Sequence, residues 1–230
     1  MVSIDTVYQK VLMFANKEQR GYITPQEFNL FADQAQLEIF EQYFYDMNFY
    51  LLKPSNSKEY SDIRDNLNEK IAVFEATGTI VGGALSTLDD FYRLGTVSGT
   101  PLVTGGVAIE LEEVQPNELL YMNNSSLAKP SDLRPVYVRT SATAIVTTPF
   151  FSSVNANYIK KPTKPNWSYV VVNGKAMYDS SNITNFELHP AEESELVYKI
   201  LKFAGVSMRK DNIVQMAQGA ESLQVQQEKQ

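Results

Sequence analysis

The chain has 230 residues, of which 43% are hydrophobic and 20% are charged, as in an ordinary globular protein. It contains no cysteine and one histidine, which excludes disulfide bonds, cysteine-based zinc sites and metal centres built from several histidines of one chain. The net charge of −7 argues against a broad surface that binds nucleic acid or anionic lipid. We see neither a secretory signal nor an apolar run of roughly 20 residues, as a membrane span requires. We therefore expect a protein made in a reducing cytoplasm, without a membrane partner.

The first 75 residues have the apolar spacing of helices. A short first helix is predicted to stop near Asn16. The segment Thr24-Pro25-Gln26-Glu27 then predicts a new helix start, because Thr24 can cap the helix and Glu27 completes a capping box. No glycine or proline follows before Pro54, so this helix should span about 28 residues, or roughly 42 Å. A third helix is predicted to begin near Ser57 and to include Phe74.

Two apolar stripes run along the long helix. Because a helix that is apolar on two sides is buried from two directions, we expect neighbours on both sides. One stripe consists of Leu30, Leu37, Phe40, Phe44, Met47 and Leu51, and the other of Phe28, Phe31, Ala35, Ile39, Tyr43 and Tyr50.

From Gly78 onward, short runs rich in Val, Ile, Thr and Tyr alternate with glycine and proline, which is typical of β-strands. The clearest prediction is a hairpin of Ser168–Val172 and Lys175–Tyr178 around Asn173-Gly174, the preferred pair for a type I′ turn. The other predicted strands are Phe91–Val97, Val107–Val114, Val136–Thr140, Ala144–Thr148 and Ala156–Lys160.

Helix is predicted again after Pro190, with Gly205 as a natural C-terminal cap, and a last helix should begin near Lys210. The predicted fold class is therefore α+β, a helical bundle formed by the N- and C-terminal segments with a central β-rich insert. Residues 1–77 are expected to supply the N-terminal helices and residues 78–188 the insert. Residues 189–230 are expected to supply the C-terminal helices, the last of which docks on a partner.

The segment from Asn16 to Glu27 resembles an EF-hand loop, with Gly21 at position 6 and Glu27 at position 12. However, Arg20 at position 5 would point a cation at the metal. A helix junction explains the same residues, with Ile23 packing against Phe28 next to the capping box. We favour the junction and predict no metal site; a calcium- or ligand-binding soluble module is the alternative from another functional class.

Other candidate sites also have structural interpretations. His189 is expected to cap or pack at a helix start, and Asp89-Asp90 to form a solvated turn. The segment Lys160–Trp167 combines cations with an aromatic ring and could touch nucleic acid, but we favour a proline-stiffened surface connection. Phosphate-binding loops and nucleophile motifs are missing from the sequence, so we predict no catalytic residues, no cofactor and no enzymatic activity.

Two segments carry apolar residues in excess of what one small bundle covers. The helical stretch from Phe40 to Leu52 contains six aromatic residues and two leucines. The last predicted helix has a narrow apolar stripe and a glutamine-rich end. Both features favour contacts between subunits. The predicted interface residues are Phe40, Tyr43, Phe44, Met47, Tyr50, Ile213, Met216, Ala217 and Leu223.

Five segments of the sequence resemble segments of a known protein family. They are Asn16–Asn29, Asp90–Leu94, Tyr158–Trp167, Phe186–Pro190 and Glu195–Gly205. Together they resemble structural proteins of tailed bacteriophages, in particular the neck or ring proteins between portal and tail in short-tailed and crAss-like phages. The resemblance extends from about residue 5 to the C-terminus.

This resemblance implies a virion structural protein, a subunit of a head–tail connector ring in the neck, assembled in the cytoplasm of the host bacterium. It implies a homo-oligomeric ring, usually of twelve copies, with the portal protein and further neck or tail ring proteins as partners. Genomic DNA would pass through the lumen without specific binding, and acidic lining groups would repel its phosphates. The alternative within phages is another adaptor, in a tail hub or at a fibre anchor.

Overall fold

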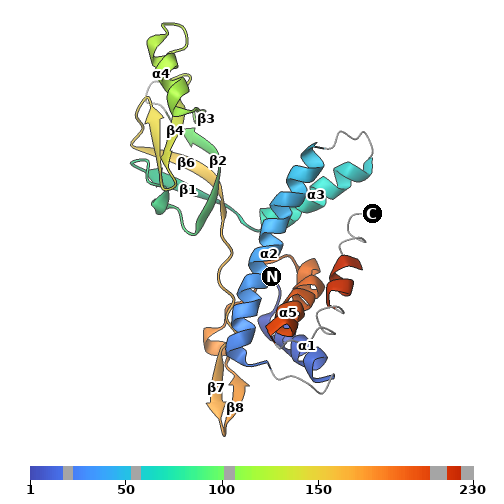
Figure 1. The fold of residues 1–230 in the computed structure, drawn as a ribbon. Coiled ribbons are helices and arrows are strands. Elements are labelled where there is room, and N and C mark those ends of the chain that lie inside the picture. The colour runs from blue at the N-terminus through green and yellow to red at the C-terminus, as the bar shows by residue number, and fades with distance from the viewer. Residues whose placement is uncertain (18–22, 53–57, 101–106, 208–216, 224–230) are drawn as a thin grey trace. The chain divides into compact units, whose positions relative to one another are not determined.

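The computed structural model describes residues 1–17, 23–52, 58–100, 107–207 and 217–223. They form two compact units, which Figure 1 displays with their elements labelled. Unit 1 comprises Met1–Val73 and Pro162–Gln230, and unit 2 comprises Phe74–Lys161. The β7–β8 hairpin, which lies within the predicted insert 78–188, belongs to unit 1.

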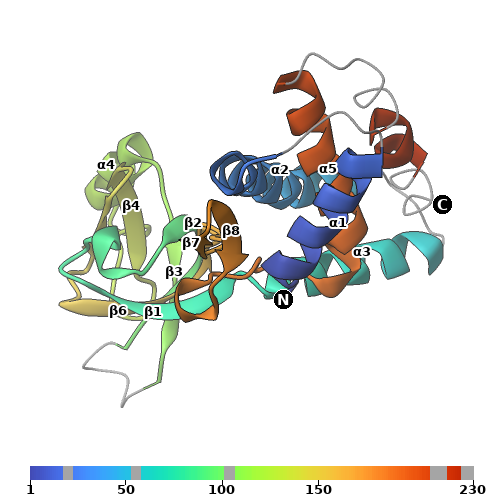
Figure 2. The same ribbon diagram turned by 90° about the horizontal axis from the view of Figure 1, so that it is seen from below.

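The described residues of unit 1 are mainly helical. Its elements are α1 (Ile4–Lys17), α2 (Pro25–Leu52), α3 (Lys58–Ala72), β7 (Tyr169–Val172), β8 (Lys175–Tyr178) and α5 (Glu193–Ser207). Helix α5 packs against α1 and α2, and α3 packs against α2, as can be followed in Figures 1 and 2. The largest fully buried side chains of this unit are Phe28, Phe40, Phe186, Ile4, Ile23, Ile39, Leu188, Leu196 and Ile200.

The start of α2 is the predicted capping box. The Thr24 amide donates to Glu27 Oε2 at 3.0 Å, and the Glu27 amide donates to Thr24 Oγ1 at 3.3 Å. Pro25 occupies the first helical position, where its missing N–H costs nothing. The predicted bounds of this helix are confirmed.

The two apolar stripes of α2 are covered to different extents by the described residues. Phe28, Ile39 and Tyr43 of one stripe are buried. On the other stripe, Phe40 is buried and Phe44 and Met47 are half-buried, whereas Leu30 is 63% exposed and Leu51 is also exposed. The described residues therefore cover the middle of the second stripe and leave its two ends exposed.

A buried amide fixes the chain where it returns to unit 1. Gln36 is fully buried in α2; its Nε2 donates to the Thr163 carbonyl at 2.8 Å, and its Oε1 accepts from the Glu187 amide at 3.1 Å. The Glu187 carboxylate accepts in turn from the Thr163 amide at 3.0 Å. These bonds hold the segments before and after the hairpin side by side on α2.

Unit 2 contains a curled six-stranded sheet. The strand order is β1-β6-β2-β3-β4-β5; all neighbours are antiparallel except β3 and β4, where Glu112 pairs with Val136 in a parallel register. The strands are β1 (Glu75–Val81), β2 (Phe91–Gly99), β3 (Ile109–Glu113), β4 (Val136–Ser141), β5 (Ala144–Thr148) and β6 (Ser153–Lys160). A short 3-10 turn, Leu85–Thr87, follows β1, and helix α4 (Pro116–Asn124) follows β3.

The predicted fold class, an α+β helical bundle with a central β-rich insert, is wrong. The chain is a mixed α/β protein, 47% helical and 29% strand, and its central sheet is too large to be a small insert on a bundle. The sheet has a core of its own, which includes Ile80, Val97, Leu111, Ile145 and Tyr158. The predicted strands that correspond to β2 to β6 pair with β1 into one continuous sheet, and this pairing cannot be read from their separate patterns.

Two elements of unit 2 and one helix end differ from the sequence-based expectation. Strand β1 was missed because only Val73 and Phe74 separate it from α3, without the glycine or proline that normally marks such a change. Helix α4 was missed because it is only nine residues long and none of its residues is fully buried; Leu119 and Met122, which are partly buried, pack against the sheet. Gly205 lies inside α5, which continues to Ser207, and is therefore not its C-terminal cap.

Candidate functional site

The C-terminal end of α2 presents a cluster of exposed apolar side chains, which we call the α2-end surface. It consists of Tyr45, Phe49, Leu51 and Leu52, four exposed apolar residues within eight positions, and Leu52 is 82% exposed. Scattered exposed apolar residues are ordinary on a protein surface, but a cluster of this kind is typical of a contact site.

Next to this surface, a pocket of about 330 Å³ lies between α2, α3 and the segment that leads into α5. Tyr50, Ile63 and Leu67 supply its apolar lining. Asp46 and Glu69 supply carboxylates. Lys70 also lines the pocket, but Glu192 holds its ammonium at 2.6 Å, so the charge of Lys70 is balanced, and Glu69 is an exposed carboxylate at the pocket.

The β7–β8 hairpin projects from a rigid base beside the start of α2. Trp167, just before β7, is 4% exposed, and its indole N–H donates to Asp5 Oδ1 at 3.0 Å. Its ring lies 4.2 Å from that of Tyr8 and stacks on Tyr169 at 5.9 Å, measured between ring centroids. This packing fixes the two strands where they leave the body of unit 1.

Beyond this base the hairpin is apolar and exposed, and we call this part the hairpin arm. The turn residues Asn173 and Gly174 have φ of 52° and 76°, as a type I′ turn requires, so the predicted hairpin is confirmed. The exposed apolar side chains of the arm are Val170, Val171, Val172 and Met177. Successive strand residues point to opposite faces, so both faces of the arm are apolar. An isolated two-stranded hairpin is at best marginally stable in water, which favours a covering partner.

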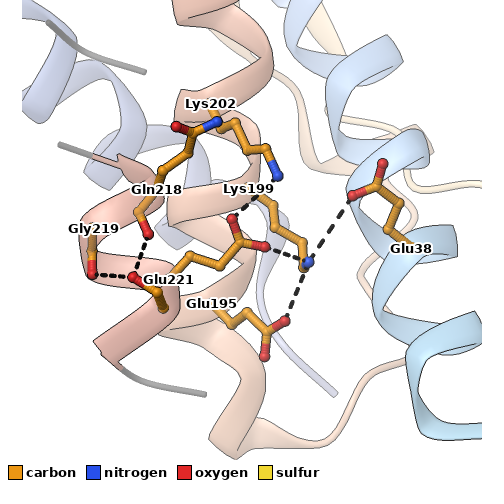
Figure 3. A network of polar contacts seen from close by, with 8 residues as sticks. Glu38, Glu195, Lys199, Lys202, Gln218, Gly219 and Glu221 are labelled. Carbon is orange, nitrogen blue, oxygen red and sulfur yellow. Dashed lines mark hydrogen bonds and ion pairs between the residues drawn. The ribbon is translucent and has the colours of Figure 1, made fainter. Parts of the chain in front are cut away.

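A third feature is an ion cluster around Lys199 (Figure 3). The Lys199 side chain is 5% exposed, and its Nζ lies 2.7 Å from Glu221 Oε1 and 3.4 Å from Glu195 Oε1. Glu38 of α2 lies at 4.0 Å, and Lys202 reaches the other oxygen of Glu221 at 3.3 Å. Helices α2 and α5 and the helical residues 217–223 thus meet at one buried ammonium group.

The charges of this cluster support one another. Burial disfavours the charge of Lys199, but the hydrogen bond to Glu221 and the nearby carboxylates outweigh this effect and raise the pKa of Lys199. Burial acts similarly on Glu221, but the two lysines outweigh it and lower the pKa of Glu221. At neutral pH Lys199 and Glu221 are therefore both charged, and their ion pair holds residues 217–223 against α5.

No protein-family model matches this chain, and no curated protein matches it significantly.

The predicted interface residues occupy different environments. Phe40, Tyr43 and Tyr50 are buried in unit 1, as is Ala217, and Leu223 is 62% exposed. Phe44 and Met47 are half-buried, with the Phe44 ring 5.0 Å from that of Phe40. Ile213 and Met216 lie outside the described residues. The exposed apolar residues in the C-terminal part of α2 are therefore neighbours of the predicted ones, namely Tyr45, Phe49, Leu51 and Leu52.

The other sequence candidates have structural partners. His189 caps the turn before α5, as predicted, because its Nδ1 accepts from the Ala191 amide at 3.3 Å. Asp89 and Asp90 form an exposed turn, also as predicted. The indole of Trp167 is buried among tyrosines, so it is not exposed for stacking on a base. Positions 18–22 of the calcium-like loop lie outside the described residues.

Two further kinds of site are missing among the described residues. They contain no group of three or more His, Asp or Glu that could hold a metal ion. They also contain no helix with the length and apolarity that crossing a membrane requires.

Sequence reasoning missed the hairpin arm and the Lys199 cluster. The signal for the arm was present, because three consecutive valines in an isolated hairpin must place an apolar side chain on each face. The spacing of Glu195 and Lys199 by four residues was also visible, but nothing in the sequence links Lys199 with Glu221 or Glu38.

Proposed function

We propose that this chain is a virion structural protein, a subunit of a head–tail connector ring between the portal and the tail of a bacteriophage. The observation that carries the proposal is that unit 1 exposes two different apolar surfaces. The hairpin arm lies near the start of α2, and the α2-end surface lies at its other end. A ring of identical subunits needs two unlike surfaces of this kind, because each copy contacts its neighbours on either side through different patches.

The phage context is supported by the family resemblance, and the residues that carry it meet in unit 1. Asn29, at the end of the segment Asn16–Asn29, is hydrogen-bonded to Trp167, at the end of the segment Tyr158–Trp167. Phe186 and Leu188 of the segment Phe186–Pro190 are fully buried. Leu196 and Ile200 of the segment Glu195–Gly205 are also fully buried. The resembling residues therefore belong largely to one packed body, which supports a resemblance in the architecture of unit 1.

The net charge of −7 also supports this role, since acidic residues on a channel wall repel the phosphates of passing DNA. The function is mechanical: unit 1 builds the ring, and the channel lets the genome pass without binding it. The C-terminal segment is proposed to dock on the portal or on a neighbouring ring. Because Glu221 holds residues 217–223 on α5, this docking requires Lys199 and Lys202 to release Glu221.

Native mass spectrometry of the purified chain, alone and mixed with the portal protein of the same phage, tests the proposal. We expect one discrete closed oligomer in at least one of the two samples, and a complex of that oligomer with the portal. A chain that stays monomeric in both samples would overturn the proposal. An oligomer that does not bind the portal but binds a purified tail would instead favour the tail-hub or fibre-anchoring adaptor.

A further inference from the structure

We propose that the hairpin arm of one copy inserts its tip into the pocket between α2 and α3 of the next copy. This inference rests on the proposed function, because it names the two surfaces through which successive ring subunits meet. The occupant of the pocket is therefore a second copy of this chain, and the contact is head-to-tail.

The shape and polarity of the arm fit a pocket better than a flat surface. Val171 and the pair Val170 and Val172 lie on opposite faces of the same strand, and all three are exposed. A flat partner would cover one face and leave the other in water. Insertion between two helices covers both faces, and the rigid Trp167 base presents the arm in one conformation, which lowers the entropy lost on docking.

The charges of the two surfaces are complementary. Lys175 is the one charged residue in the stretch from Tyr169 to Tyr178, so the arm carries a single positive charge at its tip. The pocket offers the exposed carboxylate of Glu69, while Glu192 neutralises Lys70. Tyr50, Ile63 and Leu67 provide apolar surface for the valines. A cationic apolar tip therefore matches an acidic apolar pocket.

The geometry of unit 1 prevents a copy from filling its own pocket. Asn29 fixes the base of the hairpin at the start of α2, and the pocket begins at Gln42, which is about 20 Å further along the helix. Figure 1 shows the hairpin extending beyond the start of α2, away from the end that meets α3. Arm and pocket thus lie at opposite ends of one body, and their contact repeats from copy to copy.

A charge reversal with rescue tests the contact. We expect Lys175→Glu and Glu69→Lys each to weaken oligomer formation by about tenfold or more, measured by sedimentation across a concentration series, and the double variant to restore it. Lys129→Glu, at an exposed lysine of unit 2, makes the same change in net charge as Lys175→Glu and should leave assembly unchanged. Unaltered Trp167 fluorescence in each variant shows that the base of the hairpin is intact.

Cysteine cross-linking gives a second test, since the natural chain has no cysteine. The double variant Val172→Cys with Asn66→Cys should form a ladder of disulfide-linked multimers under oxidation, whereas each single variant should not. Multimers of Val172→Cys alone would show hairpins meeting one another and would overturn the head-to-tail contact. An oligomer that forms normally with Lys175→Glu would overturn this contact and leave the proposed function standing. A natural chain that is monomeric both alone and with the portal would overturn both.

Discussion

Trp167 and Asn29, 138 positions apart, are joined by two backbone-to-side-chain hydrogen bonds: the Trp167 amide donates to Asn29 Oδ1 at 2.8 Å, and Asn29 Nδ2 donates to the Trp167 carbonyl at 3.2 Å. One side chain on the second turn of α2 thereby pairs both backbone groups of the residue that anchors the hairpin. The chain that returns from unit 2 is fixed to α2 here and at Gln36. The direction of the hairpin arm therefore depends on α2.

Replacing Asn29 with Ala should loosen this base. The variant leaves the amide of the buried Trp167 without its acceptor, so we expect the free energy of unfolding to fall by about 1–3 kcal/mol. Urea unfolding followed by fluorescence measures it directly, because Trp167 is the chain's only tryptophan. The matched control is Asn48→Ala, at an exposed position of the same helix, which should change stability by less than about 0.5 kcal/mol. Equal effects of the two variants would contradict this role of Asn29.

Lys199 and Lys202 of the ion cluster should differ strongly in their contribution to the free energy of unfolding. Lys199→Met leaves the buried carboxylate of Glu195 near an uncharged side chain, and breaking a buried ion pair from one side costs about 3–5 kcal/mol. Lys202 is 28% exposed, so Lys202→Met should cost about 1 kcal/mol or less. Adding Glu195→Gln to Lys199→Met should recover part of the loss, since it removes the buried negative charge that Lys199 balanced. Chemical denaturation of the natural chain and the three variants compares these free energies of unfolding. Similar small losses for Lys199→Met and Lys202→Met would contradict a buried cluster.

The attachment of residues 217–223 should depend on pH in acid. The pKa of Glu221 is lowered from its ordinary 4.5 in the folded chain. The contribution of Glu221 to the attachment is therefore present above pH 4.5 and is lost as the pH falls through the lowered pKa. The pKa of Lys199 is raised above 10.5, so its contribution is complete below that pH and is lost as the pH rises through the raised value. The attachment is therefore constant through neutral pH.

Amide hydrogen exchange of a peptide covering 217–223, corrected for intrinsic rates, measures this attachment. Protection should be constant between about pH 6 and pH 8 and should decline below about pH 4.5. In Glu221→Gln, protection should be lower at neutral pH and should lose most of its dependence on acid. Protection that is unchanged by the substitution would show that the segment is held by other contacts.

The parts of the fold that depend on neighbouring residues were predictable from the sequence. Helix α2 was placed correctly because Thr24, Pro25 and Glu27 act within one turn, and the hairpin because Asn173-Gly174 specifies its own turn. The strands β2 to β6 were recognised from composition. The assembly of these strands into one large sheet was not predicted, because no local sequence pattern indicates the parallel pairing of Glu112 with Val136.

The candidate surfaces were only partly predictable for the same reason. An excess of aromatic residues around Phe40–Leu52 was visible, but which of them are covered depends on where α3 and α5 pack. Tyr43 and Tyr50 are buried, and Tyr45 and Phe49 are not, although all four are aromatic residues of one helix. Likewise, no pattern in the sequence marks Lys199 as a buried residue, and its burial is evident only with Glu38 and Glu221 in place.

The turn between β1 and the rest of unit 2 offers a test of the sheet's geometry. Gly82 and Gly83 both have positive φ, at 61° and 78°. A Cβ atom on Gly83 would overlap the carbonyl oxygen of Ile145, because the Ile145 amide donates to the Gly83 carbonyl at 2.8 Å and holds the two backbones together. A Cβ atom on Gly82 would meet nothing within 4 Å.

Gly82→Ala should therefore cost only the conformational strain, about 1–2 kcal/mol, whereas Gly83→Ala should cost roughly 1–3 kcal/mol more because the backbones must separate. Thermal unfolding followed by circular dichroism compares the two variants. Hydrogen exchange should show faster opening of the Ile145 amide in Gly83→Ala and not in Gly82→Ala. If both variants lose the same stability and the Ile145 amide stays protected in both, then the close approach of these strands is not what requires glycine at this turn.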